Sequence, residues 1–126
     1  MSLAVELSAL RGRIVEYGPT AFLVTVTDRE TPHVVSVTVR WENDRLVVPV
    51  GRRTRANLEH RATVTLLWPP GPDPGYSMIV DGTFVASPGD ASEIAVEPQS
   101  AVLHRVVGVD DHAPKCLPLG EPNTGA

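Results

Sequence analysis

Short runs of β-branched and apolar residues follow one another along most of this chain, and they constrain its fold more than any other feature. Six such runs stand between polar or proline- and glycine-rich punctuation: "TAFLVTVT", "TPHVVSVTVRW", "RLVVPV", "ATVTLLW", "YSMIVDGTFVAS" and "SAVLHRVVGV". Valine, isoleucine, threonine and aromatic residues pack well on a pleated sheet, so these runs predict strands. The chain is therefore predicted to be mainly β, with six antiparallel strands.

The connections between the runs refine this expectation. The short polar segments "DRET" and "ENDR" predict an antiparallel meander for the first three strands. Asp81 and Gly82 interrupt the fifth run and predict a bulge or tight bend. Residues 88–98 are expected to form a polar connection with at most one helical turn. A small barrel fits six strands because closure removes exposed edges, and a sandwich is the alternative.

Two helices are expected besides the strands. Residues 2–17 carry one apolar stripe at spacings of three and four, which predicts an amphipathic helix that Gly18 and Pro19 end. Residues 54–60 are short and helix-compatible, with Thr54 as the expected N-cap. Strands "HVVSVTV" and "RLVVPV" offer apolar side chains to both faces, which a homodimer would cover.

Size and composition restrict the class of protein. The 126 residues suit one domain over residues 1–109, followed by a proline- and glycine-rich tail over residues 110–126. No apolar run approaches the roughly 20 residues that span a bilayer, and Glu6 and Glu16 interrupt any signal-peptide core, so we expect a cytoplasmic protein without a membrane partner. Cys116 is the only cysteine, which excludes an intrachain disulfide.

The segment "GRRTRAN", residues 51–57, is the most unusual local feature of a chain whose net charge is -4. A strand that ends at Val50 and Gly51 leads into a helix start surrounded by arginines. Free N–H groups at a helix start and bidentate guanidinium groups both suit a phosphate. An exposed turn with an Arg55 to Glu59 pair is the alternative reading. The overall acidity argues against a nucleic-acid surface.

The order of the segments is more specific than any one of them. The run from Thr20 to Trp68 resembles the pyridoxamine 5'-phosphate oxidase-like, flavin-binding split-barrel superfamily, and the resemblance extends over roughly residues 3–109. The matching residues are Pro32 to Val39, Val47 to Gly51, Thr54 with Asn57 and Leu58, and Val64 to Trp68. The chain lacks the C-terminal W-x-x-x-R-type segment of true pyridoxamine phosphate oxidases. We therefore do not expect that specific activity.

The resemblance implies a six-stranded split barrel, a homodimer and a flavin-type cofactor at the subunit interface, either FMN or a deazaflavin. It also implies the cofactor-binding residues: Val35, Ser36 and Val37 on the strand that faces the ring system, and Val50, Gly51, Arg52, Arg53, Thr54, Arg55 and Asn57 around the phosphate. Many members have a lysine where this chain has Thr54. The implied activity is oxidoreduction of a small molecule, and a non-catalytic carrier of flavin, deazaflavin or haem is the alternative.

Other chemistry has little support in the sequence. The four histidines, at positions 33, 60, 104 and 112, show no metal-ligand spacing, so no metal site is expected. Neither a serine in a nucleophile elbow nor a well-placed cysteine–histidine pair is present. A cofactor that performs the redox step would leave the protein to supply binding, orientation and electrostatics. The catalytic residues are therefore left unassigned.

Overall fold

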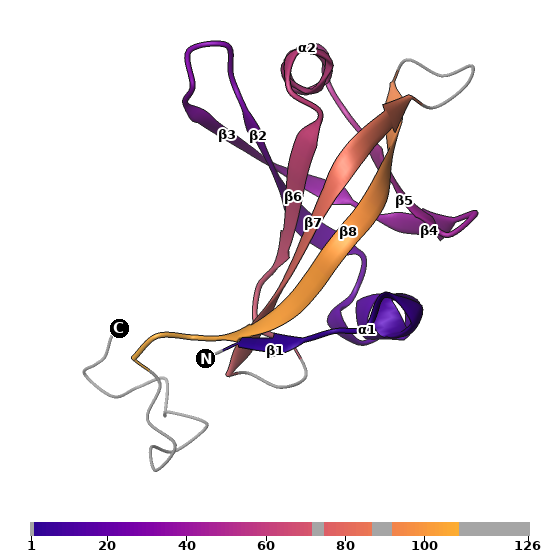
Figure 1. Ribbon diagram of the computed structural model, residues 1–126, viewed down its shortest axis with the longest axis vertical. Helices are drawn as coiled ribbons and strands as arrows, with labels where there is room; N and C mark the ends of the chain where they lie inside the picture. The colour runs from indigo at the N-terminus through magenta and orange to yellow at the C-terminus, as the bar shows by residue number, and fades with distance from the viewer. Residues whose placement is uncertain (1, 72–74, 87–91, 109–126) are drawn as a thin grey trace, which may run out of the picture.

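One curled antiparallel sheet forms the body of the protein in a computed structural model, which describes residues 2–71, 75–86 and 92–108 (Figure 1). The strands run in the order β3-β2-β6-β7-β8-β5-β4, and β1 pairs with β8 off this path. Their bounds are β1 Ser2–Ala4, β2 Thr20–Val26, β3 Pro32–Thr38, β4 Arg40–Glu42, β5 Arg45–Pro49, β6 Thr63–Trp68, β7 Tyr76–Ala86 and β8 Glu93–Arg105. The predicted mainly β class is confirmed, but the described residues form eight strands rather than six. The expected tail, with His112 and Cys116, lies outside the described residues.

The N-terminal segment differs from its prediction. Residues 2–4 form strand β1 instead of the first helical turn, a 3-10 turn follows at Leu7–Ala9, and helix α1 covers only Leu10–Tyr17. The reason is the long strand β8, which pairs with β5 only at its beginning and has an open edge near its end. Strand β1 covers that edge, and the Val5 N–H continues the pairing with the Ala101 carbonyl oxygen at 2.8 Å. Sheet pairing thus takes precedence over a helix-like apolar spacing.

The second predicted strand divides at Val39. The Val39 N–H donates to the Pro19 carbonyl oxygen at 2.7 Å, which extends the β2–β3 register by one residue, and the chain then continues into β4, which pairs with β5. Strand β2 pairs with β3, and β5 pairs with β4, the last part of the second predicted strand, so both turns of the predicted meander are confirmed; β5 also pairs with β8. Asn43 and Asp44 both have positive φ in the β4–β5 turn, as a type I′ hairpin demands.

The predicted bulge at Asp81 and Gly82 is confirmed by a register shift between those two residues. Asp81 lies opposite Ser100 and Gly82 opposite Pro98, so Gln99 is the extra residue on β8. A Cβ atom at Gly82 would lie 2.6 Å from the Glu97 carbonyl oxygen, so only glycine fits there. The polar connection expected over residues 88–98 is wrong for its second half, because β8 begins at Glu93 and accommodates Pro98 at the bulge.

The core lies inside the curl of the sheet, where α1 also packs. Strand β6 shows the alternation that its sequence predicts, with Val64, Leu66 and Trp68 buried. The Trp68 indole N–H donates to the Gly18 carbonyl oxygen at 2.8 Å, which fixes the end of α1 against β6. Other fully buried side chains come from α1, β2, β5, α2, β7 and β8: Leu10, Leu23, Leu46, Val48, Leu58, Met78, Val80, Ile94 and Val96.

Helix α2, Arg52–His60, lies across the end of the sheet between the β2–β3 hairpin and the neighbouring end of β7 and β8 (Figure 1). It begins two residues earlier than predicted. Gly51, in an extended conformation, is its N-cap residue, and the Arg55 N–H closes the first turn on the Gly51 carbonyl oxygen at 3.1 Å. Thr54 is therefore not the N-cap but a buried residue within the helix, because its side chain faces the sheet.

Candidate cofactor pocket

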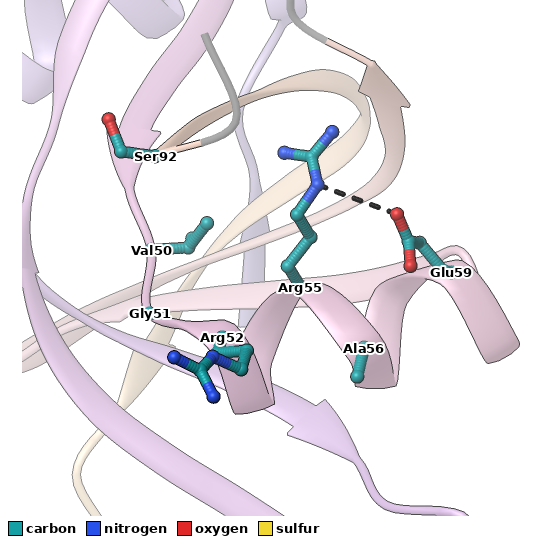
Figure 2. A pocket seen from close by; sticks show the side chains of 7 residues that line it. All are labelled: Val50, Gly51, Arg52, Arg55, Ala56, Glu59 and Ser92. Carbon is teal, nitrogen blue, oxygen red and sulfur yellow. Dashed lines mark ion pairs between the residues drawn. The ribbon is translucent and has the colours of Figure 1, made fainter.

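A pocket of about 440 Å³ opens beside the first two turns of α2 (Figure 2). Its lining residues come from the end of β5, from α2 and from the start of β8: Val50, Gly51, Arg52, Arg55, Ala56, Glu59 and Ser92. The Val50 N–H donates to the Ser92 carbonyl oxygen at 2.8 Å, which brings the two distant segments together. Its size lies within the range usual for small-molecule sites.

Arg55 is the most firmly held cation of the pocket. Its side chain is 22% exposed, its Nη1 donates to the Glu93 carbonyl oxygen at 3.2 Å, and its Nε lies 3.4 Å from Glu59 Oε2. The guanidinium also lies over the Phe84 ring, 5.8 Å from the ring centroid. The contacts with β7 and β8 fix the direction of this side chain, so little rotamer freedom remains to be lost when an anion binds.

Glu93 links the pocket to β4, the edge strand that lies beside β5 in the sheet. Its backbone carbonyl accepts from Arg55, while its carboxylate forms a two-pronged pair with Arg40 at 2.6 and 3.1 Å. Hydrogen bonding to this carboxylate raises the pKa of the Arg40 guanidinium above its ordinary value. The Arg40–Glu93 pair holds the beginning of β8, next to Ser92 in the pocket.

The pocket contains four of the predicted cofactor-binding residues, namely Val50, Gly51, Arg52 and Arg55. Arg53 is exposed on the helix but does not line the pocket. Thr54 and Asn57 are 3% and 7% exposed on the side of α2 that faces the sheet. The Asn57 side-chain amide donates to the buried Thr25 hydroxyl at 3.1 Å, so in this chain it attaches α2 to β2.

The three predicted residues on β3 lie outside the pocket lining. Val35 and Val37 point inward, toward the core, and Ser36 is exposed on the outer face. Strand β3 is the last strand of the sheet order, so its outer edge carries backbone groups with no sheet neighbour in the described chain. A role in contacting the ring system stays a prediction for these residues.

Sequence reasoning did not assign Ala56, Glu59 and Ser92 to the pocket. Ala56 and Glu59 follow Arg52 at spacings of four and seven, so they lie on the same helical face once the helix start is known. The Arg55–Glu59 pair itself was predictable from its spacing of four and is present. Ser92 has no local signal, because only the pairing of β5 with β8 brings it there.

Two further properties of the described residues bear on function. No helix among them combines the length and the apolarity needed to cross a membrane. Within residues 2–71, 75–86 and 92–108, no group of three or more histidine, cysteine, aspartate or glutamate side chains could hold a metal ion.

Comparison with known proteins gives relatives in sequence and in structure. No family model matches the chain. Two uncharacterized proteins, one from Mycobacterium bovis and one from Mycobacterium tuberculosis, are each 42% identical over 120 residues, covering 84% of this chain and 84% of the relative. Identity at this level over most of both chains establishes a shared family.

Similar solved structures identify the fold. A FAD-binding protein from Mesorhizobium loti has a TM-score of 0.62 at 11% identity, over 82% of this chain and 96% of its own. A Listeria innocua protein assigned as a pyridoxamine 5'-phosphate oxidase has 0.59 at 18%, over 78% and 98%. An F420 reductase has 0.56 at 18%, over 71% and 93%.

A haem storage protein from Vibrio cholerae shares the fold at a TM-score of 0.51 and 15% identity, over 72% of this chain and 89% of its own. The identities between these solved structures and the chain are all below 20%, so the likeness establishes the fold and not the ligand. The chain belongs to the same family as the two mycobacterial proteins, and its fold is that of the pyridoxamine 5'-phosphate oxidase-like split-barrel superfamily.

Proposed function

We propose that this protein binds a flavin-type cofactor, FMN or a deazaflavin, with the cofactor phosphate in the pocket beside α2. The observation that carries the proposal is that two arginines, Arg52 and Arg55, line the pocket beside the start of α2 in a chain with the split-barrel fold. Structures with this fold include an F420 reductase and a FAD-binding protein.

The pocket residues suit a phosphate ester. Guanidinium groups grip phosphate oxygens through paired N–H donors, and the first N–H groups of α2 have no partner inside the helix. Gly51 leaves the backbone open there, since a Cβ atom would meet nothing within 4 Å. Val50 and Ala56 add apolar wall beside the charged groups, as the sugar-alcohol chain of a flavin would need.

We further propose a homodimer that places the cofactor at the subunit interface. The support is an apolar row on the outer face of the sheet, where Phe22, Leu67, Ile79 and Val102 are direct neighbours on four adjacent strands. Phe22 is 38% exposed, and Val34, in the adjoining row, is 55% exposed. A second copy of the chain would cover this face and lie against the open edge of β3.

The proposed activity is oxidoreduction of a small molecule in the cytoplasm. A bound flavin or deazaflavin supplies the hydride chemistry itself. The residues of the chain hold the phosphate through Arg52 and Arg55, and the β3 edge orients the ring. The single cysteine agrees with a reducing compartment. We propose neither nucleic acid nor membrane as a partner.

Titration of the purified protein with FMN and with a deazaflavin, followed by absorption and fluorescence, tests cofactor binding. We expect micromolar binding of at least one of them, and a loss of about a hundredfold when Arg52 and Arg55 are both replaced by alanine. The control is Arg13→Ala, which removes an arginine from an ion pair on α1. If neither cofactor binds the wild-type protein, the proposed function is wrong.

A carrier without turnover is the second candidate, because the haem storage protein shares the fold. Oxidation of the reduced cofactor by a panel of small acceptors separates the two. An enzyme shows acceptor-dependent oxidation above the rate in solution, whereas a carrier binds the cofactor and leaves that rate unchanged. A parallel titration with haem in place of flavin measures whether the protein binds haem instead.

A further inference from the structure

The pocket contains one carboxylate among its charged side chains. The ionisable residues that line it are Arg52, Arg55 and Glu59, which sum to a formal charge of +1. Glu59 comes from the helical turn that follows Arg55 and reaches toward it (Figure 2). A site meant only to attract phosphate would gain nothing from a carboxylate at this position, so its effect on ligand choice is the question.

Glu59 keeps most of its contact with water. Its side chain is 61% exposed, against 22% for Arg55, and the 3.4 Å separation between Arg55 Nε and Glu59 Oε2 is long for a charge-assisted hydrogen bond. An exposed pair of this kind contributes little to stability. Arg55 has other supports in the Glu93 carbonyl oxygen and the Phe84 ring. Glu59 is therefore not needed to direct Arg55, and its remaining property is negative charge beside the bound anion.

The charge of the ligand decides how strongly Glu59 opposes it. A terminal phosphate monoester carries close to two negative charges above pH 7, because its second pKa is about 6. A phosphodiester carries one. The Coulomb repulsion by a carboxylate at fixed distance is twice as large for the doubly charged group, and removal of that group from water also costs more.

We propose that Glu59 is a specificity-determining residue, which biases the pocket toward a cofactor whose phosphate is esterified on both sides and against a terminal monoester such as FMN. This inference rests on the proposed function. Among the flavin-type ligands considered above, it favours a deazaflavin whose side chain continues beyond the phosphate. The pocket charge of +1 then matches the single charge of the ligand.

The test compares FMN with its 5'-phosphate methyl ester, two ligands that differ by one methyl group and about one charge. Dissociation constants are measured at pH 8 for the wild-type protein, Glu59→Gln and the control Glu16→Gln. Glu16 is a matched control because it pairs with Arg13 on α1 at 3.2 Å and is 52% exposed. Helix α1 lies at the opposite end of the molecule from α2 (Figure 1).

We expect Glu59→Gln to tighten binding of the ester by about threefold and binding of FMN by about tenfold, since the repulsion doubles with ligand charge. The ratio of the two dissociation constants then shifts by about threefold toward FMN. Glu16→Gln should leave both constants and their ratio unchanged, and both variants should keep the wild-type melting temperature to within a few degrees.

Other results overturn the inference. Equal weakening of both ligands in Glu59→Gln would mean that the carboxylate positions Arg55 and does not select by charge. Unchanged dissociation constants for both ligands in Glu59→Gln would mean that Glu59 neither positions Arg55 nor selects by charge. Both outcomes leave the proposed function intact, because the wild-type protein still binds. If the wild type binds neither FMN nor the ester nor a deazaflavin, the proposed function and this inference fail together.

Discussion

Arginines flank both ends of α2, but they make different contacts. At its beginning, Arg52 and Arg55 line an open pocket. At its end, Arg61 donates from Nη1 to the Thr27 carbonyl oxygen at 2.7 Å and lies 3.7 Å from Glu30, so it joins the helix to the β2–β3 turn. The arginine cluster in the sequence therefore contains both candidate ligand-binding residues and a residue with a structural role. Only the three-dimensional structure distinguishes the two groups.

Replacement of Asn57 by alanine should have the largest effect on stability, because it removes the buried attachment of α2 to β2. The lost hydrogen bond leaves the Thr25 hydroxyl without its amide donor, and a small cavity forms. We expect about 2–3 kcal/mol of destabilisation, measured by urea unfolding. Asn57→Asp keeps the shape but replaces the amide donor with a buried carboxylate, so it should destabilise the protein at least as much as Asn57→Ala. Wild-type stability in Asn57→Ala would show that this bond does not hold the helix.

Replacement of Arg55 by alanine should affect binding more than folding. We expect cofactor binding to weaken by about tenfold to thirtyfold, because a charge-assisted contact contributes about 1.5–2 kcal/mol. The melting temperature should fall by only a few degrees, since the pairs that Arg55 makes with Glu59 and the Glu93 carbonyl oxygen are partly exposed. Arg55→Lys keeps the charge and should recover part of the affinity. A fall in stability without a change in cofactor affinity would show that Arg55 has a structural role and does not bind the cofactor.

Much of the local structure around this helix was predictable, and its long-range assembly was not. The alternation of β6, the β2–β3 hairpin and the bulge at Gly82 follow from side-chain pattern and turn chemistry. The start of β8 was missed because Pro98 argues against a strand unless a bulge receives it. Ser92 was missed as a pocket residue because it reaches the site only through strand pairing far along the chain.

The same limit applies to the candidate site. Arg52, Arg55 and Gly51 could be chosen from residue type and position, since a strand end followed by a helix start predicts where donors gather. Thr54 and Asn57 share that segment, but which face of the helix they occupy depends on where α2 begins and on which side it meets the sheet. A start two residues earlier than predicted leaves both facing inward.

Replacement of Arg61 by alanine should lower stability without weakening cofactor binding, because Arg61 contacts the β2–β3 turn and does not line the pocket. The loss of the bond to the Thr27 carbonyl oxygen is expected to cost about 1 kcal/mol, since the side chain is 34% exposed and its pairing with Glu30 is long. Cofactor affinity should change less than twofold. Native-state hydrogen exchange offers the most direct measurement, with faster exchange expected in the β2–β3 turn. A tenfold loss of affinity would instead place Arg61 with the pocket arginines.

Replacement of Arg53 by alanine should have the smallest effect and is the sharpest check on the division of α2. Arg53 stands between two pocket-lining residues in sequence, but its exposed side chain leaves the helix outside the lining. In one chain alone, its removal should alter stability by less than about 0.5 kcal/mol and affinity by less than twofold. In the proposed homodimer, however, an exposed cation beside the pocket could reach a cofactor held partly by the second copy. A loss of affinity that appears at dimer-forming concentrations and vanishes on dilution would assign Arg53 to the site of the neighbouring subunit.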